Sequence, residues 1–197
     1  MNEEKIKRKA IRLSIIGDSK TGKTSILNCF LGQKFTFDMI SNIGIDKQEK
    51  IMKMNDGTEI KVIIWDTAGQ ERFHSVSSGT IKNSQGIIVA FALDDLSSFN
   101  NVITWLQDVR EISTNIPIVL FGNKCDLVDN RKVEKEEAEE FANNNEVTYF
   151  ETSAKENINI KEGFDKIIEE AYKKAVYEES IKLQAKKADE AKKKKFC

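Results

Sequence analysis

Apolar residues are distributed along the chain in two patterns, short runs and helical spacing, which predict strands followed by helices. Runs that are β-branched or almost continuously apolar predict strands over residues 11–18, 47–54, 60–66, 86–93, 116–123 and 147–153. Apolar residues at helical spacing predict helices over residues 23–31, 97–112, 133–144 and 157–178. The second of these helices has Ser97 or Ser98 as its expected N-cap.

This order of elements predicts an α/β fold with a mostly parallel sheet covered by helices on both faces. The Asp-Gly step at residues 56–57 predicts a hairpin, which adds one antiparallel edge strand. The residues expected to face the core from the helices are Phe99, Val102, Ile103, Leu106, Val109, Arg110, Ala138, Phe141, Ala142, Ile160, Phe164, Ile167, Ile168 and Ala171. In such folds ligands bind at the carboxyl ends of the strands.

The length of 197 residues suits one domain of ordinary size with a tail. We expect an N-terminal extension over 1–8, one domain over 9–178 and a charged tail over 179–197. The net charge of −1 gives no support for a nucleic-acid binder. The chain has no apolar run of the ~20 residues that a membrane span needs, and its charged start is no secretory signal. Three widely spaced cysteines (Cys29, Cys125 and Cys197) fit a reducing compartment.

The stretch GDSKTGKT at residues 17–24 matches a phosphate-binding loop, and it lies between a predicted strand and a predicted helix. Backbone amides of such a loop cradle anionic oxygens, while Lys23 adds a positive charge near the outer phosphates. The Thr24 hydroxyl is a suitable ligand for Mg²⁺. A glycine-rich turn with a chance lysine is the alternative. The candidate binding residues here are Gly17, Ser19, Lys20, Thr21, Gly22, Lys23, Thr24 and Ser25.

A second motif, DTAG at residues 66–69, closes the predicted strand 60–66. Asp66 at this strand end can face the same magnesium ion, and the Gly69 amide can meet a γ-phosphate. Gln70 follows directly and can orient an attacking water, which makes it the candidate catalytic residue. An ordinary Asp-Gly turn is the alternative interpretation.

Two further motifs, NKCD at 123–126 and SAK at 153–155, follow predicted strands and predict a site for guanine. The Asp126 carboxylate can accept hydrogen bonds from guanine N1–H and the 2-amino group, whereas adenine would leave that charge unsatisfied. The Ala154 amide can reach guanine O6, and the Lys155 stem can lie along the purine. The candidate residues are Asn123, Lys124, Asp126, Ser153, Ala154 and Lys155.

With these motifs, the chain over residues 9–175 resembles a Ras-superfamily small GTPase, most closely of the Rab branch. GDSxxGKT, IGID (43–46) and WDTAGQERF (65–73) carry the Rab resemblance. It implies a phosphate-loop NTPase fold with a six-stranded sheet and about five helices, bound GTP or GDP with Mg²⁺, and slow GTP hydrolysis. It also places Phe35 at the edge of the guanine ring, with a core aromatic as the alternative.

The same resemblance implies a monomer that acts in vesicle traffic, in the cytoplasm and on the cytoplasmic face of an intracellular membrane. An exchange factor, a GTPase-activating protein and effectors would bind through residues 37–47 and 69–82. In Rab-like chains aromatic residues usually occupy the positions of Lys47 and Thr80, and with Trp65 they form the patch that effectors read. Here Trp65 alone is kept, so we expect different partners. Trp65 as a half-buried sheet residue is the alternative.

Two more departures, at Asn42 and Lys20, concern the site. Asn42 replaces the threonine whose hydroxyl binds Mg²⁺ and whose amide contacts the γ-phosphate in Rab-like chains. Asn42 can ligate magnesium through its side-chain oxygen, or the loop can close through its backbone alone. Lys20 stands where small residues are common, either as a second cation near the phosphates or as a solvent-facing side chain. His74 is interpreted as a surface or partner contact, because Gln70 already holds the catalytic position.

The tail contains seven lysines against two acidic residues from Lys182 on, and it ends at Cys197. A solvated, disordered end is one interpretation. The other is a membrane anchor over 192–197, with a prenyl group on Cys197 and a basic patch as the second signal. No residue follows Cys197, so the end is not a C-a-a-X box.

Three functions are compatible with these motifs. The first is a GTP-hydrolysing switch, favoured by Gln70. The second is a guanine-nucleotide-binding scaffold without proper switch closure, favoured by Asn42 and Lys20. The third, an ATP-dependent kinase, is disfavoured by NKCD. We therefore predict a GTPase, with the scaffold as its alternative.

Overall fold

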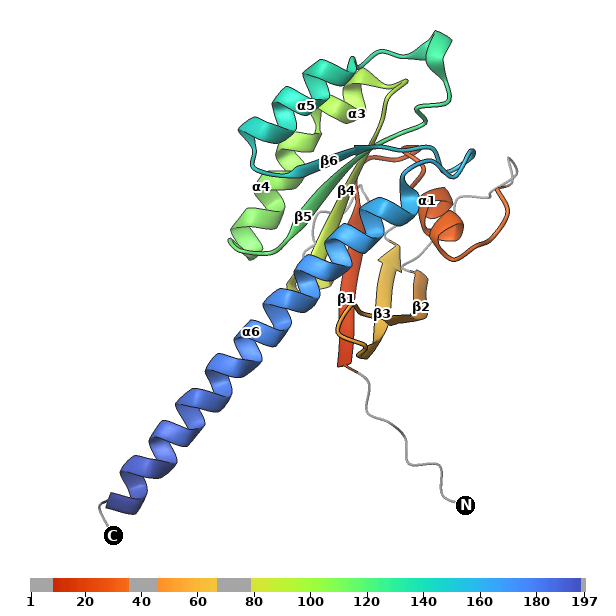
Figure 1. Cartoon of the computed structure of the whole chain (residues 1–197). Helices are drawn as coiled ribbons and strands as arrows, with labels where there is room; N and C mark the ends of the chain where they lie inside the picture. The colour runs from red at the N-terminus through yellow and green to blue at the C-terminus, as the bar shows by residue number, and fades with distance from the viewer. Residues whose placement is uncertain (1–8, 36–45, 67–78, 196–197) are drawn as a thin grey trace, which may run out of the picture.

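The computed structural model describes residues 9–35, 46–66 and 79–195 (Figure 1). Its strands are β1 (Lys9–Ile16), β2 (Asp46–Lys53), β3 (Glu59–Asp66), β4 (Gly86–Ala92), β5 (Ile118–Asn123) and β6 (Thr148–Glu151). Its helices are α1 (Lys23–Phe30), α3 (Leu96–Asn100), α4 (Val102–Ile112), the short 3₁₀ helix η1 (Val128–Asn130), α5 (Lys135–Asn144) and α6 (Ile160–Lys195).

The six strands form one sheet in the order β2-β3-β1-β4-β5-β6. All neighbouring pairs are parallel except β2 and β3, which form the predicted hairpin with β2 at the edge. The predicted fold class is therefore confirmed. The central strand β4 is buried at every position, because helices cover it on both faces.

Two hydrophobic clusters pack on opposite faces of the sheet. α1 and α6 supply one, where the Phe30 and Phe164 rings stack with centroids 3.9 Å apart. α3, α4 and α5 supply the other, in which Phe91 packs against Phe99 at 5.0 Å. Because helices cover both faces of the sheet, a polar ligand can bind at the loops that follow the strand ends.

The predicted helix 97–112 is wrong in its continuity. The structure has two helices, α3 and α4, separated at Asn101, and the side chain of Asp95 caps α3 by accepting a hydrogen bond from the Ser97 amide. Ser98 instead is buried and bonds to the backbone of Ala92 and Asp95. Ile103, predicted to face the core, is 37% exposed, whereas Trp105 is 5% exposed.

The last helix begins at Ile160 and continues to Lys195, well past the predicted end at residue 178. Its predicted stripe from Ile160 to Ala171 is buried, as expected. From Val176 to Lys187 every side chain is exposed, and this half of α6 projects away from the sheet (Figure 1). A disordered tail is thus wrong as far as Lys195. Within the described ranges, no helix has the length and apolar character that crossing a bilayer requires.

Candidate functional site

The loop between β1 and α1 encloses the ammonium group of Lys23. This side chain is only 5% exposed, and its nitrogen donates hydrogen bonds to the carbonyl oxygens of Gly17 at 2.8 Å and Asp18 at 2.7 Å. Carbonyl oxygens offset a buried positive charge only in part. The loop therefore suits an anionic ligand next to Lys23.

Two glycines allow the loop to approach its neighbours closely. A Cβ on Gly17 would lie 2.0 Å from the Ala90 carbonyl oxygen, and one on Gly22 would lie 2.3 Å from Asn123 Nδ2. Gly22 has φ 91° and supplies no capping side chain to α1. The first backbone amides of α1 therefore have no side-chain cap, and they form an N-terminus suited to binding phosphate oxygens.

The remaining predicted loop residues differ in exposure. Ser19 and Lys20 are exposed, Thr21 is buried, and Ser25 is half-buried. Lys20 has φ 64°, a left-handed conformation that is uncommon for a residue with a Cβ. Of its two interpretations, the exposure agrees with a solvent-facing side chain.

Two hard oxygen atoms meet beside the phosphate loop. Thr24 Oγ1 donates a hydrogen bond to Asp66 Oδ2 at 2.6 Å, and Asp66 is 1% exposed at the end of β3. A hydroxyl and a carboxylate are oxygen ligands of the kind that Mg²⁺ prefers. The donor set therefore fits magnesium.

Asn123, at the end of β5, joins the loops that the sequence assigns to phosphate and to base. Its Nδ2 donates to the Thr21 carbonyl oxygen at 2.9 Å. Its Oδ1 accepts a hydrogen bond from the Ala154 amide at 3.2 Å. The two ends of the predicted site are therefore held together by one buried side chain.

The NKCD and SAK motifs also contact each other directly. Ser153 Oγ donates a hydrogen bond to Asp126 Oδ1 at 2.6 Å, and Lys155 Nζ lies 4.0 Å from Asp126 Oδ2. Lys124, with φ 69°, forms an ion pair with Asp94 at 3.0 Å. These contacts orient the Asp126 carboxylate, the group predicted to read guanine.

Several predicted residues are not positioned by these contacts. Asn42, Gly69, Gln70 and His74 lie outside the described residues, as does Cys197. Phe35 is half-buried, five residues after α1 ends. The predicted partner segments 37–47 and 69–82 are described only at Asp46, Lys47 and residues 79–82.

The described part of the predicted partner surface is charged. Lys47 faces Trp65 across the β2–β3 ladder, and its ammonium lies 5.8 Å from the indole centroid. Lys47 also pairs with Glu49 at 2.7 Å, while Thr80 is buried. Trp65 is half-buried and overlaid by a cation, so a partner meets a charge here.

Four residues that the sequence analysis did not single out lie in the predicted loops or contact them. They are Asp18, Asp94, Asn101 and Trp105, which bond to one another or to Lys124. Asn101 and Trp105 are four residues apart and therefore lie on one face of a helix. The sequence signal for these two residues is their spacing, which does not predict that both donate hydrogen bonds to Asp18.

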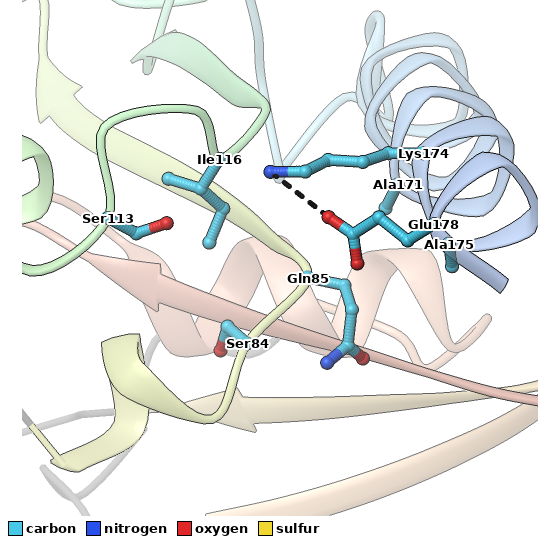
Figure 2. Close-up of a pocket in the computed structure, with 8 residues that line it drawn as sticks. All are labelled: Ser84, Gln85, Ser113, Ile116, Ala171, Lys174, Ala175 and Glu178. Atoms are coloured by element: carbon cyan, nitrogen blue, oxygen red, sulfur yellow. Dashed lines mark ion pairs between the residues drawn. The ribbon is translucent and has the colours of Figure 1, made fainter. Parts of the chain in front are cut away.

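A separate pocket of about 170 Å³ lies at the other end of the sheet (Figure 2). Its lining residues are Ser84, Gln85, Ser113, Ile116, Ala171, Lys174, Ala175 and Glu178. Lys174 within it donates to the Asn115 carbonyl oxygen at 2.5 Å and pairs with Glu178 at 3.9 Å. Ser84 and Gln85 precede β4, whereas the predicted site loops follow strands, so this pocket is distinct from the candidate site.

Comparison with known proteins agrees with this geometry. A sequence model of the Ras family matches residues 12–173. GTP-binding protein YPT1 of Saccharomyces cerevisiae is 42% identical over 154 residues, which cover 78% of this chain and 74% of that protein. Ras-related protein Rab-10 of Diplobatis ommata is 39% identical over 169 residues, covering 85% and 84%. Ras-related protein Rab-13 of Rattus norvegicus is 38% identical over 157 residues, covering 79% and 77%.

Proposed function

This chain belongs to the Ras family and is a Rab-like small GTPase, and we propose that it is a GTP-dependent switch in membrane traffic. The observation that carries the proposal is the position of Asn123. Its side chain bonds to the phosphate loop at Thr21 and to the base loop at Ala154. One nucleotide can therefore contact both loops at once.

At the phosphate end, Lys23 holds the outer phosphate oxygens together with the amides at the start of α1. The burial of its ammonium against the carbonyls of Gly17 and Asp18 supports this role. Thr24 and Asp66 would hold Mg²⁺, whose charge offsets that of the phosphate oxygens when it is bound.

At the base end, Asp126 recognises guanine through N1–H and the 2-amino group. Ser153 donates a hydrogen bond to one of its carboxylate oxygens at 2.6 Å, and this bond fixes the orientation of the carboxylate. The Ala154 amide contacts guanine O6, Lys155 covers the purine face, and Phe35 lies at the ring edge. Adenine leaves the carboxylate unsatisfied and is rejected.

Hydrolysis rests on Gln70, which orients the water that attacks the γ-phosphate. The amides of Asn42 and Gly69 sense that phosphate and order the two switch segments. The choice of asparagine at position 42 favours one rival, a guanine-nucleotide-binding scaffold in which the first switch does not close.

Partners read the switch through residues 37–47 and 69–82, and the Lys47 ammonium over the Trp65 ring excludes partners that need an apolar patch. An exchange factor and a GTPase-activating protein act on the same segments. The lysine-rich end with Cys197 supplies membrane attachment, which would be lost in Cys197→Ser as judged by fractionation of cells.

A competition experiment tests the nucleotide assignment. GTP and unlabelled GDP should displace labelled GDP, whereas ATP should not do so at the same concentrations. Equal displacement by ATP would show that Asp126 and Ala154 do not read guanine.

Single-turnover hydrolysis then separates the enzyme from the scaffold. Gln70→Leu should slow hydrolysis and leave GDP affinity nearly unchanged, because Gln70 contacts only the attacking water. An unchanged rate would favour the scaffold. Asn42→Thr should increase the protection of residues 38–46 in hydrogen exchange with a GTP analogue, if asparagine is a poor magnesium ligand.

A further inference from the structure

The carboxylate of Asp18 connects the phosphate loop to helix α4. Its Oδ2 accepts a hydrogen bond from Asn101 Nδ2 at 2.6 Å, and its Oδ1 accepts one from Trp105 Nε1 at 2.8 Å. Asp18 is the second residue of the loop, and the two donors are more than 80 residues away in the sequence. Both oxygens of one carboxylate are thus directed to one helix.

The same residue contacts Lys23 through its backbone. The Asp18 carbonyl oxygen accepts hydrogen bonds from Lys23 Nζ at 2.7 Å and from Thr21 Oγ1 at 3.0 Å. The side chain of Asp18 therefore binds α4 while its carbonyl holds the lysine that faces the phosphates. A shift of α4 or loss of these bonds would move the carbonyl that positions Lys23.

The helix end of this connection is rigid. Trp105 is 5% exposed and lies in the same core cluster as Leu106 and Val109, so its indole cannot follow a loop that moves. The segment is also fixed near its start, where Asp94 pairs with Lys124 of the base loop at 3.0 Å. The α3–α4 segment therefore contacts the loops at both ends of the site.

We propose that Asp18 is a positioning residue through which α4 sets the conformation of the phosphate loop and the contact of Lys23 with the outer phosphates. The inference rests on the proposed nucleotide site and extends it to a helix that does not belong to any of the nucleotide motifs. It assigns a role to Asn101 and Trp105 beyond packing.

The first test compares GDP with GMP, which lacks the outer phosphate that Lys23 faces. Asn101→Ala removes an exposed donor that makes no capping bond in α4, so the variant should fold. Asn101→Ala and Trp105→Phe should each weaken GDP binding by roughly 10-fold or more, the effect of losing a hydrogen bond to a charged group. GMP binding should change far less.

Val109→Ala is the matched control, because Val109 is fully buried in α4 and belongs to the core. It should lower the midpoint of thermal unfolding and leave the ratio of GDP to GMP affinity unchanged. If Asn101→Ala and Trp105→Phe weaken both nucleotides equally, the role of the contacts is general stability, and the proposal is overturned. A wild-type protein with no preference for GDP over GMP would instead overturn the proposed nucleotide site.

A double-mutant cycle with Asp18→Ala gives the second test. If α4 acts through the carboxylate, Trp105→Phe should have almost no further effect on GDP affinity once Asp18 is alanine. A Trp105→Phe effect of the same size in both backgrounds would mean that the indole acts by packing alone, and this would also overturn the proposal.

Discussion

At the scale of single residues, Asp126 offers the sharpest test of base recognition. Its carboxylate is 12% exposed, and one of its oxygens accepts a hydrogen bond from Ser153 at 2.6 Å. The carboxylate is therefore held in one orientation and is largely shielded from water. Asp126→Asn replaces one acceptor by a donor. GDP affinity should fall by roughly 10- to 100-fold, the effect of a hydrogen bond to a charged group.

Xanthosine diphosphate provides the check on this change. Its base carries an oxygen where guanine has the 2-amino group, and that oxygen can accept from the new amide. Competition binding should therefore show a gain for xanthosine diphosphate in the variant. Loss of both nucleotides alike would point to a disturbed loop and not to base recognition.

The pair of Thr24 and Asp66 makes a prediction about metal removal. If these oxygens hold magnesium, a chelator should accelerate the release of fluorescent GDP from the unaltered protein. Thr24→Ala removes one ligand, so release should be fast already and respond little to the chelator. A strong chelator response in Thr24→Ala would place the metal elsewhere.

At the scale of elements, polar contacts beyond the core stripe hold α6 against β1 and the β2–β3 hairpin. Lys9 pairs with Glu179 at 2.8 Å and lies 5.8 Å from the Tyr172 ring, while the Tyr172 hydroxyl donates to Asp56 at 2.8 Å. Glu179 and Asp56 are exposed and Lys9 and Tyr172 are only half-buried, so the contribution of these contacts is small and sensitive to salt. They nevertheless fix where the helix leaves the domain.

The Lys9–Glu179 pair predicts a dependence of local helix stability on pH. The hydrogen bond from Lys9, followed by its charge, lowers the pKa of Glu179 below its usual value of 4.5. A lowered carboxyl pKa adds stability above pH 4.5 that is lost as the pH falls through the folded-state value. Amide exchange near residue 179 should therefore speed up below about pH 4.5, relative to the intrinsic rate, and Lys9→Gln should abolish this step.

Much of the fold and of the site could be predicted from short-range patterns. Apolar runs such as β4 and the stripe of α6 follow from local periodicity, and the site loops carry their own residue signatures. The break at Asn101 could not be predicted, because an Asp95 cap and the bonds from Asn101 and Trp105 to Asp18 favour two short helices. The ion pair of Asp94 with Lys124 was missed for the same reason, since its partners meet only in three dimensions.

The extension of α6 beyond residue 178 follows from local helix propensity. Beyond residue 178 the sequence has no glycine or proline to stop the helix, and it is rich in lysine and alanine. Before that point, Lys166–Glu170 at 2.9 Å and Glu169–Lys173 at 2.7 Å pair at i, i+4 spacing, and Lys174–Glu178 at 3.9 Å continues these pairs to the predicted end of the helix. Charge alone predicts a disordered end, whereas helix propensity predicts the helix that the structure shows.

At the scale of the whole molecule, α6 begins on the compact domain and its outer part contains the lysines from Lys182 to Lys195 (Figure 1). The 36 residues of this helix extend over about 54 Å at 1.5 Å per residue. Since side chains from Val176 to Lys187 are exposed, the outer half contributes little to the core. Folding and membrane attachment should therefore be separable by truncation.

A chain ending at Ser180 tests this separation, because it keeps the core stripe and the Glu179 contact but loses all seven lysines from Lys182 on. Its free energy of unfolding and its GDP affinity should match the full chain, to within about 0.5 kcal/mol for the former. We expect the full chain without lipid to bind anionic vesicles weakly and in a salt-dependent way, and this binding should disappear in the truncated chain, since each lysine near the surface contributes roughly 1 kcal/mol. A chain ending at Glu170, which removes buried Ala171 and half-buried Tyr172, should by contrast unfold at lower temperature. If the chain ending at Ser180 is destabilised as well, α6 beyond Ser180 packs on the domain. The predicted boundary between residues 178 and 179 would then be wrong.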